Sequence, residues 1–190
     1  NSEVVHGIPS EKVILQEGDL VSVDCGVVKE GFYGDTAFSF EVGVVSPEVR
    51  RLLSTTRESL YKGIEAAVEG NRVGDIGYAV QTHAESGGYS VVREMVGHGL
   101  GRNMHEAPEV PNYGRRGSGP KLRKGMVICI EPMINMGRRQ IRQEPDGWTI
   151  RAADNLPSAH FELAVAIDKG EADILLRFLY IDEVLKKQSN

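Results

Sequence analysis

The sequence has few cysteines and no long apolar run, although it is 190 residues long. Its two cysteines, Cys25 and Cys129, lie in segments with a strand-like pattern, and we expect buried free thiols in a reducing compartment rather than a disulfide. No segment approaches the roughly 20 consecutive apolar residues of a membrane-spanning helix, and the first residues do not resemble a secretory signal. We therefore expect a cytoplasmic protein without a membrane partner.

An excess of positive charge is also lacking. The chain has 22 Lys and Arg residues against 27 Asp and Glu residues, which gives a formal net charge of -5. This balance argues against a nucleic-acid binder that relies on an overall basic surface. Hydrophobic residues at 41% and charged residues at 26% are typical of a folded globular protein. Because the chain shows no internal repeat or linker, we expect a single domain over residues 1–190.

Apolar alternation and turn signals predict the order of the secondary-structure elements. Strands are expected at 12–28 and 32–45, on either side of a turn at 29–31. A helix follows, with Ser46 as its N-cap and Pro47 at its first position, and it ends near Gly70. A second helix is expected at 74–86. Further strands are expected at 89–95, 126–134, 147–152, 159–167 and 174–178, with an irregular segment at 97–120 and a short charged ending.

Two aspartates interrupt the strands of the expected hairpin. Asp24 and Asp35 stand among Val, Ala and Phe residues, where a buried carboxylate is costly unless a partner stabilises it. If the turn has an even number of residues, both side chains project from one face, about 5–8 Å apart at Cβ. Two like charges at that separation share either a proton or a cation. The pair alone leaves both alternatives open.

Three more polar residues, His98, Glu131 and Glu162, stand in or beside apolar segments. Each alone is more often a turn, edge or solvated residue. Together with the two aspartates they give four carboxylates and one imidazole, which suits Mn, Fe, Co or Zn better than a structural thiolate zinc site. We therefore predict that these five residues bind two divalent metal ions, whose charge balances the four carboxylates.

Six short motifs follow one another along this chain. They are His6-Gly7-Ile8-Pro9, Gly34-Asp35-Thr36, Gly97-His98-Gly99-Leu100-Gly101-Arg102, His105-Glu106-Ala107-Pro108, Ile130-Glu131-Pro132-Met133 and His160-Phe161-Glu162. Their order resembles that in the type I methionine aminopeptidases. Glu131 follows His98 by 33 positions, which leaves no room for the helical insert of the type II enzymes. The resemblance extends over essentially the whole chain.

This resemblance implies the pita-bread fold, an α+β arrangement of antiparallel strands and flanking helices around a dinuclear metal site. By position, Asp24 would chelate one metal ion, and Asp35 and Glu162 would bridge both. His98 and Glu131 would bind the second ion. A water or hydroxide between the metals would be the nucleophile.

The resemblance also implies the function and the residues that contact substrate. The family removes the initiator methionine from peptides and nascent proteins by hydrolysis. Glu131 would move the proton of the nucleophile. His105 would donate to the scissile carbonyl oxygen, and His6 would contact the scissile amide nitrogen or help protonate the leaving amine. Met104 and Trp148 would line the methionine pocket, although plain core packing is an equal alternative for Trp148.

Two other functions are compatible with the same ligands: a hydrolase like prolidase or aminopeptidase P, and a pita-bread module that binds without catalysis. Leu163 stands where the family usually has His, and this departure favours the binding module without catalysis. The sequence also begins five residues before His6 and lacks strands that complete the first half of the family fold. We expect an open sheet edge there, and therefore either poor solubility as a monomer or a homodimer across that edge.

Overall fold

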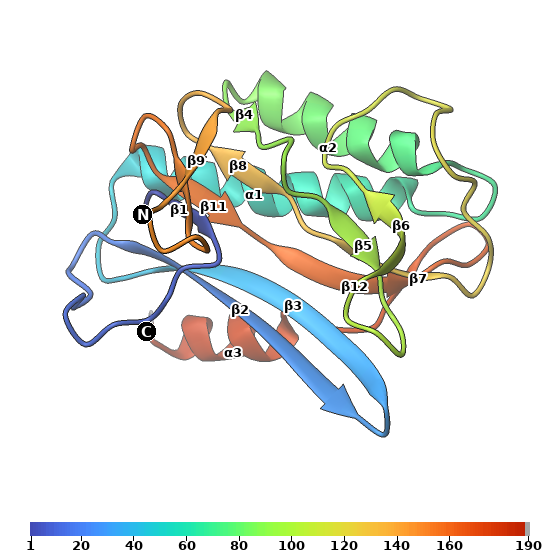
Figure 1. The fold of residues 1–190 in the computed structure, drawn as a ribbon, viewed down its shortest axis with the longest axis horizontal. Coiled ribbons are helices and arrows are strands. Elements are labelled where there is room, and N and C mark those ends of the chain that lie inside the picture. The colour runs from blue at the N-terminus through green and yellow to red at the C-terminus, as the bar shows by residue number, and fades with distance from the viewer. Residues whose placement is uncertain (189–190) are drawn as a thin grey trace.

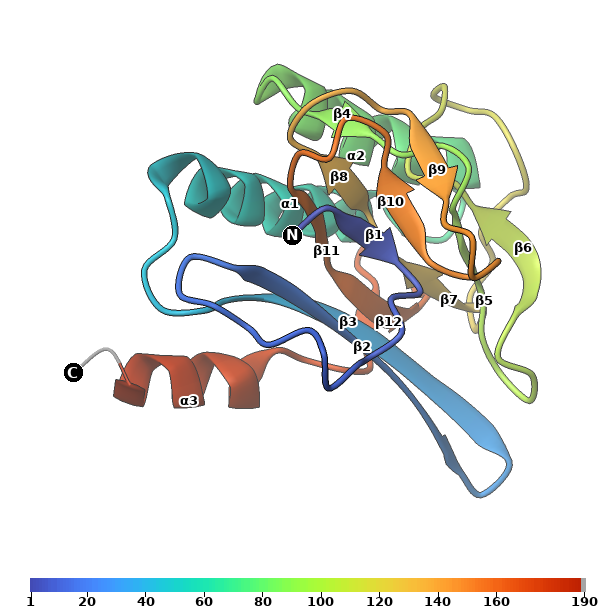
Figure 2. The same cartoon turned by 60° about the vertical axis from the view of Figure 1, so that its left-hand side comes forward.

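A long hairpin is the first large element of the computed structural model, which describes residues 1–188. Its strands are β2 (Leu20–Lys29) and β3 (Phe32–Glu41), which pair antiparallel along their whole length. Glu30 and Gly31 form the turn with φ of 53° and 80°, the left-handed pair that closes a tight two-residue hairpin. Figure 2 shows this hairpin projecting beyond the other strands.

The register of the hairpin puts both aspartates on one face. Asp24 pairs with Ala37, and Asp35 pairs with Gly26, so the two aspartates are diagonal neighbours. This confirms the arrangement expected from an even-length turn. The first strand is shorter than predicted, because residues 12–19 form loops and turns.

The strands of residues 1–188 form three antiparallel sheets. The largest has the order β2-β3-β12-β7-β5-β6, with β13 beside β12; its further strands are β5 (Gly97–Gly99), β6 (Glu106–Val110), β7 (Val127–Ile130), β12 (Glu162–Ala166) and β13 (Asp173–Ile174). The second contains β1 (Glu3–Val5), β10 (Ile150–Ala152) and β9 (Ile141–Gln143). The third contains β11 (Ser158–His160), β8 (Met133–Asn135) and β4 (Ser90–Val91).

Two predicted strands are each broken once, and the breaks matter for function. Pro132 lies between β7 and β8, and Phe161 lies between β11 and β12, so each predicted strand passes from one sheet into another. The N–H of Phe161 donates to the carbonyl of Pro132 at 3.4 Å, so the two breaks lie side by side. Glu131 and Glu162 flank these breaks. The segment at 97–120, expected to be irregular, contains β5 and β6.

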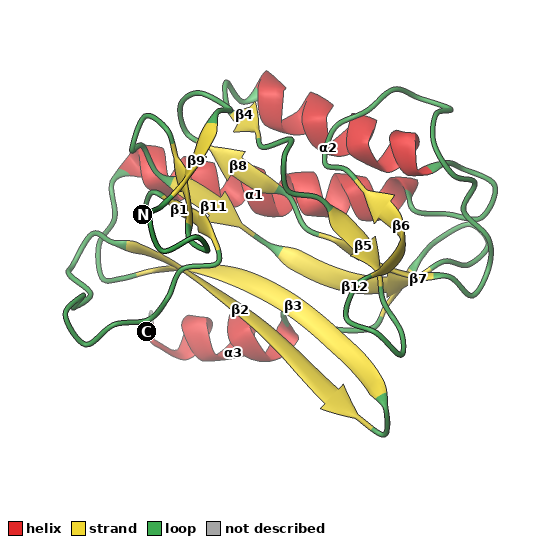
Figure 3. Ribbon diagram, viewed as in Figure 1, coloured by secondary structure: helices red, strands yellow, loops and turns green. Residues whose placement is uncertain are grey.

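Helices α1 (Pro47–Ala66) and α2 (Val73–Ser86) agree closely with the predicted helices. The Ser46 side chain accepts the N–H of Val49, as an N-cap does. Figure 1 shows α1 and α2 side by side along the sheets, and Figure 3 shows the strands beneath them in yellow. None of the helices in residues 1–188 has the length and apolar character needed to span a membrane.

The main core lies between these two helices and the strands. It includes Leu52, Leu60, Ile76, Val80, Ile128, Ile130, Leu163 and Val165. Gly63 of α1 allows the close approach, since a Cβ there would lie 2.8 Å from Cγ2 of Val80. Leu163 points into this core and Glu162 to the opposite face, because neighbouring strand residues alternate. The leucine therefore contributes packing of about 1.5–3 kcal/mol and does not face the metal-ligand candidates.

The last helix, α3 (Leu179–Gln188), stands where the sequence pattern predicts only a strand and a charged ending. Its position depends on contacts from distant residues. Phe178 is buried in the core, and Arg57 of α1 makes a bidentate ion pair with Asp182, with a shortest distance of 2.6 Å. The sequence near α3 does not indicate such contacts between distant residues. The prediction of a short charged ending without a helix is therefore wrong.

Cys25 is exposed, which corrects the expectation of two buried thiols; Cys129 is buried as predicted. Cys25 lies on β2, which is the edge strand of the large sheet. The part of β2 from Val23 to Lys29 is exposed. Val23 and Val27 of the same strand are exposed as well. Pairing between copies of the chain along this edge stays a prediction.

Candidate metal centre

Four buried side chains from neighbouring strands meet on one face of the large sheet. They are Asp35 of β3, His98 of β5, Cys129 of β7 and Glu162 of β12. Each offers a ligand atom, and these atoms all lie within 4.8 Å of one another. Because β3, β12, β7 and β5 are adjacent in the sheet, side chains from distant parts of the sequence share one small volume.

Glu131, directly after β7, extends this cluster. Its Oε1 lies 3.5 Å from Nε2 of His98, and Oδ2 of Asp35 lies 3.8 Å from the same nitrogen. Two atoms that each lie about 2.0–2.2 Å from one cation are separated by at most about 4.4 Å. Both separations therefore leave room for an ion between the ligand atoms. Three of the predicted ligands thus meet around His98.

Asp24 occupies the open side of the cluster. The residue as a whole is exposed, because it lies on the edge strand, and it is not among the four groups within 4.8 Å. Even so, desolvation raises the pKa of its carboxyl, while the nearby His160 lowers this pKa and Asp35 raises it. Asp24 is therefore within electrostatic range of the other predicted ligands.

The carboxyl groups of the cluster are in an environment that disfavours their charged forms. Burial raises the pKa of Glu131 and Glu162 well above the usual value, and neighbouring carboxylates raise both pKa values further. Burial also raises the pKa of Asp35, against the opposing effect of His98. Four acidic groups this close require protons or cations to be stable.

Two carboxylate oxygens without a hydrogen-bond partner indicate whether these residues fit a metal ion. Oδ1 of Asp35 and Oε1 of Glu162 are buried and have no hydrogen-bond partner among residues 1–188. A buried polar atom without a partner costs about 1–3 kcal/mol, and more if it is charged. A divalent cation would satisfy both oxygens and reverse the electrostatic repulsion. The donor atoms present therefore fit divalent metal ions.

The two predicted catalytic histidines lie at the border of this cluster. The ring of His105 contacts the ring of His98 edge to face, with centroids 4.4 Å apart. His6 lies near Asp24, whose pKa it lowers, and it has a positive φ of 60° that few non-glycine residues adopt. His6 therefore lies on the Asp24 side, and His105 lies on the His98 side.

The predicted pocket residues also border the site. Trp148 is 57% exposed and its ring stacks on His6 at 4.8 Å, so the alternative of plain core packing is wrong. Met104 lies against the hairpin: its Cε is 2.5 Å from the place where Gly26 would carry a Cβ, and Oδ1 of Asp35 is 3.9 Å from that same place. Met104 is thus near the predicted ligand Asp35, and Trp148 contacts the predicted catalytic residue His6.

Sequence reasoning missed two residues of the site. The buried thiol of Cys129 donates a hydrogen bond to Glu162, and burial raises its pKa. His160 is 2% exposed, and burial lowers its pKa to about 4. Cys129 precedes Glu131 by two residues, and His160 precedes Glu162 by two. Because alternate residues of a strand share a face, this spacing is the signal that could have revealed them.

The fold and the buried, oxygen-rich cluster are those of a metal-dependent hydrolase, and comparison with known proteins specifies the class. Residues 1–168 match metallopeptidase family M24. The chain is 50% identical over 175 residues to a methionine aminopeptidase of Clostridium acetobutylicum, an alignment that covers 92% of this chain and 70% of that protein. The chain therefore belongs to metallopeptidase family M24.

Solved structures agree with this assignment. The structure of a methionine aminopeptidase from Thermotoga maritima matches with a TM-score of 0.90 and 44% identity, over 92% of this chain and 70% of that one. A prolidase from Pyrococcus furiosus matches with a TM-score of 0.70 and 26% identity, over 90% and 45% of the two chains. The pita-bread fold expected from the sequence motifs is thereby confirmed.

Proposed function

We propose that this protein is a methionine aminopeptidase, which hydrolyses the first peptide bond of peptides and nascent proteins that begin with methionine. The observation that carries the proposal is the convergence of Asp35, His98, Glu131 and Glu162 in one buried cluster. The 50% identity with a methionine aminopeptidase supports the same conclusion.

Two divalent ions of Mn, Fe, Co or Zn are the proposed cofactors. Asp24 would hold one ion, His98 and Glu131 would hold the other, and Asp35 and Glu162 would contact both. The unpaired oxygens of Asp35 and Glu162 support this assignment. When bound, such a pair of ions activates water as a nucleophile and stabilises negative charge on the reacting carbonyl oxygen.

Proton transfer is assigned to Glu131. Its carboxyl is buried beside other acidic groups, and both effects raise its pKa well above the usual value and favour the protonated form. A cation nearby opposes this shift and brings the pKa back toward the range where a group both accepts and releases protons. Glu131 would take the proton of the nucleophile and return it to the leaving amine.

Two histidines would orient the substrate. His105, in contact with His98, would donate a hydrogen bond to the scissile carbonyl oxygen and stabilise it as charge develops. His6, near Asp24, would contact the scissile amide nitrogen. Between them, Met104 and Trp148 would border the pocket for the methionine side chain. Met104 is unbranched and flexible, so it can adapt to another unbranched apolar chain.

The two alternative functions are less well supported. The alignment with the prolidase structure covers 45% of that chain, whereas the alignment with the aminopeptidase structure covers 70% of that chain. The TM-score is also lower for the prolidase, at 0.70 against 0.90. A binding module without catalysis would gain nothing from burying unpaired carboxylate oxygens, which are costly without a cation. The structural comparison and the unpaired carboxylate oxygens thus both favour the aminopeptidase.

The direct test measures methionine released from a Met-Ala-Ser peptide by protein that holds two equivalents of Mn or Co. We expect release, and little cleavage of an X-Pro dipeptide. His105→Ala should lower kcat about 10²–10³-fold, since it removes one donor to the developing oxyanion. No release with two equivalents of metal bound would overturn the proposal, and cleavage of X-Pro substrates alone would favour a prolidase.

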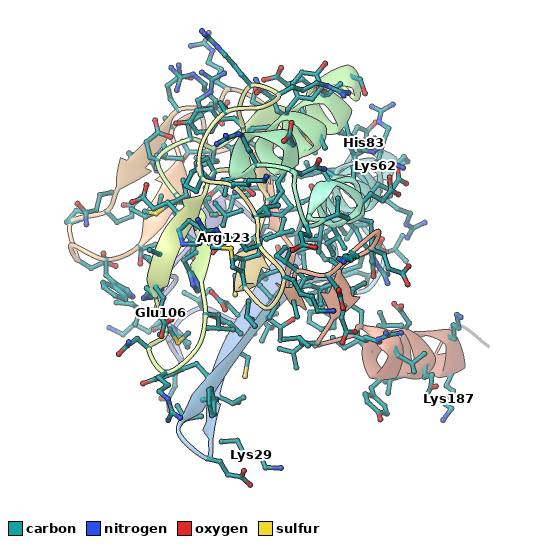
Figure 4. The ribbon with its side chains drawn as sticks, turned by 90° about the vertical axis from the view of Figure 1, so that its right-hand side faces the viewer. Lys29, Lys62, His83, Glu106, Arg123 and Lys187 are labelled. Atoms are coloured by element: carbon teal, nitrogen blue, oxygen red, sulfur yellow. The ribbon has the colours of Figure 1, made fainter. Side chains whose placement is uncertain are left out.

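A matched control for His105→Ala is His83→Ala. His83 lies on α2 and pairs with Glu58 at 3.0 Å, away from the cluster. Figure 4 shows His83 beside Lys62, on the opposite side of the molecule from Glu106. His83→Ala should leave kcat unchanged. An equal loss in both variants would mean that the effect comes from the fold and not from the site.

A further inference from the structure

His160 is a buried histidine that the proposed reaction does not use. It is the last residue of β11, and only 2% of it is exposed. Its Nε2 is buried and has no hydrogen-bond partner among residues 1–188. Such an atom costs about 1–3 kcal/mol if nothing satisfies it. An explanation is therefore needed for a nitrogen that is held in this place without a partner.

The backbone of His160 is fixed against the hairpin that carries the two aspartates. Ser39 of β3 donates its hydroxyl to the carbonyl of His160 at 2.8 Å and accepts the N–H of His160 at 2.9 Å. Ser39 itself is buried and lies 2.7 Å from the hydroxyl of Ser22 on β2. Both polar groups of its backbone are therefore held by one hydroxyl, and the burial of the side chain leaves the ring little room to turn elsewhere.

Glu131 lies between two imidazoles. Its Oε1 is 3.5 Å from Nε2 of His98, and its Oε2 is 3.8 Å from Nε2 of His160. The second separation is too long for a hydrogen bond, yet both are below the limit of about 4.4 Å for two atoms bound to one cation. His160 also interacts electrostatically with Asp24. His160 therefore lies at a distance from Glu131 comparable to that of His98, and within electrostatic range of Asp24.

We infer that Nε2 of His160 is an additional ligand of the metal centre, for the ion beside Asp24; Oε2 of Glu131 faces this nitrogen, while Oε1 of Glu131 faces His98. The inference rests on the metal centre of the proposed function and extends its donor set to six residues. Without His160, the ion beside Asp24 would have carboxylate ligands only. A second imidazole makes both ions nitrogen-bound, which favours Fe, Co or Zn over Mn.

The test is the nitrogen chemical shift of each histidine when Zn²⁺ binds. The chain has five histidines, so protein labelled with ¹⁵N-histidine gives a spectrum that can be fully assigned from single substitutions. We expect the Nε2 signals of His98 and His160 to move on addition of two equivalents of Zn²⁺. His160→Gln should remove one of the two responding signals, and His83→Gln should remove a signal that does not respond.

The possible outcomes separate the inference from the proposed function. If Zn²⁺ moves the signal of His98 alone, the inference is wrong and the metal centre stands. If it moves neither signal, the proposed centre itself fails. Should His160→Gln not fold, substitutions of the other four histidines assign the remaining signal to His160. Calorimetric titration gives a second measurement: His160→Gln should weaken binding of one Zn²⁺ equivalent at least about tenfold, and unchanged affinity contradicts the inference.

Discussion

At the level of single residues, two of the metal-ligand candidates destabilise the metal-free fold. Asp35 and Glu162 are buried, each has an oxygen without a hydrogen bond, and burial raises the pKa of both. The same atoms are the ones that would bind cations. Function and stability are therefore opposed at these positions, as long as no metal is bound.

This opposition leads to a prediction for Glu162→Gln. The amide cannot ionise, so the metal-free variant avoids a buried charge and should be more stable by about 1–3 kcal/mol, or roughly 3–10 °C in Tm. Zn²⁺ or Mn²⁺ should no longer raise its Tm. Thermal unfolding with and without metal measures both effects.

Glu65→Gln is the matched control, because Glu65 is exposed on α1 and pairs with Lys62 at the surface. Such a surface pair contributes about 0–1 kcal/mol, so this change should have little effect on Tm and none on metal binding. A lower metal-free Tm for Glu162→Gln than for the control would contradict the electrostatic account.

The predicted ligands could be found from sequence because each is a charged or polar residue in an apolar segment. Any one of them alone is more often a turn, edge or solvated residue, so it is the set of five that carries the prediction. The structure brings Asp35 to 3.8 Å and Glu131 to 3.5 Å from His98. Cys129 and His160 could not be found in this way. A cysteine in an apolar strand resembles any small hydrophobic residue, and a single histidine there is more often structural than functional.

At the scale of elements, the hairpin turn sets the register that places Asp24 and Asp35 on one face. Glu30 and Gly31 both have positive φ, which suits Gly but not Glu. Glu30→Asn should therefore stabilise the fold by about 0.5–1 kcal/mol, since Asn-Gly is the preferred sequence for this turn. Urea unfolding measures the gain.

The hairpin prediction has its own control. Gly31→Val puts a β-branched side chain at a φ of 80° and should destabilise the protein by more than Glu30→Asn stabilises it. Neither variant should alter the number of metal ions bound if the register is kept. Destabilisation by Glu30→Asn would show that the turn has a different geometry.

Elements with strong local signals were predictable, and those fixed by distant contacts were not. The N-cap Ser46 and Pro47 predict the start of α1, and the structure confirms it. By contrast, nothing near Leu179 predicts α3, which depends on Phe178 in the core and on the Arg57–Asp182 ion pair. The breaks at Pro132 and Phe161 were also missed, because a continuous apolar run gives no sign that a strand changes sheets.

At the scale of the whole molecule, the raised carboxyl pKa values make stability depend on pH. In the metal-free folded protein, Glu131 and Glu162 hold protons at pH values where the unfolded chain has released them. The folded state then binds more protons, so the free energy of unfolding falls as pH rises above about 4.5. His160 has the opposite effect, because its pKa of about 4 in the folded protein lies below the usual 6.5. Its contribution to the free energy of unfolding therefore rises as pH increases from about 4 to 6.5.

Above pH 6.5 the His160 effect is complete, but the buried amino group of Asn1, whose pKa burial lowers from the usual 8.0, opposes the carboxyl effect. We expect the two carboxyl groups, whose pKa values are raised well above the usual one, to outweigh this single amino group. We therefore predict that metal-free protein becomes less stable as pH rises from 6.5 to 8, and that saturating Zn²⁺ or Mn²⁺ removes this decline. Urea unfolding in the presence of a chelator, repeated across this range with and without metal, measures the slope. A metal-free stability that is constant or rises over this range would contradict the pKa directions given above.

The proposed function requires that side chains from separate strands form one site for two metal ions. A crystal structure of the protein soaked in Mn²⁺, with the ions located by anomalous scattering, tests this requirement. We predict two ions about 3.5–4 Å apart, within bonding distance of the five ligands Asp24, Asp35, His98, Glu131 and Glu162. Ions bound only elsewhere, or no ion among these residues at saturating Mn²⁺, would contradict it.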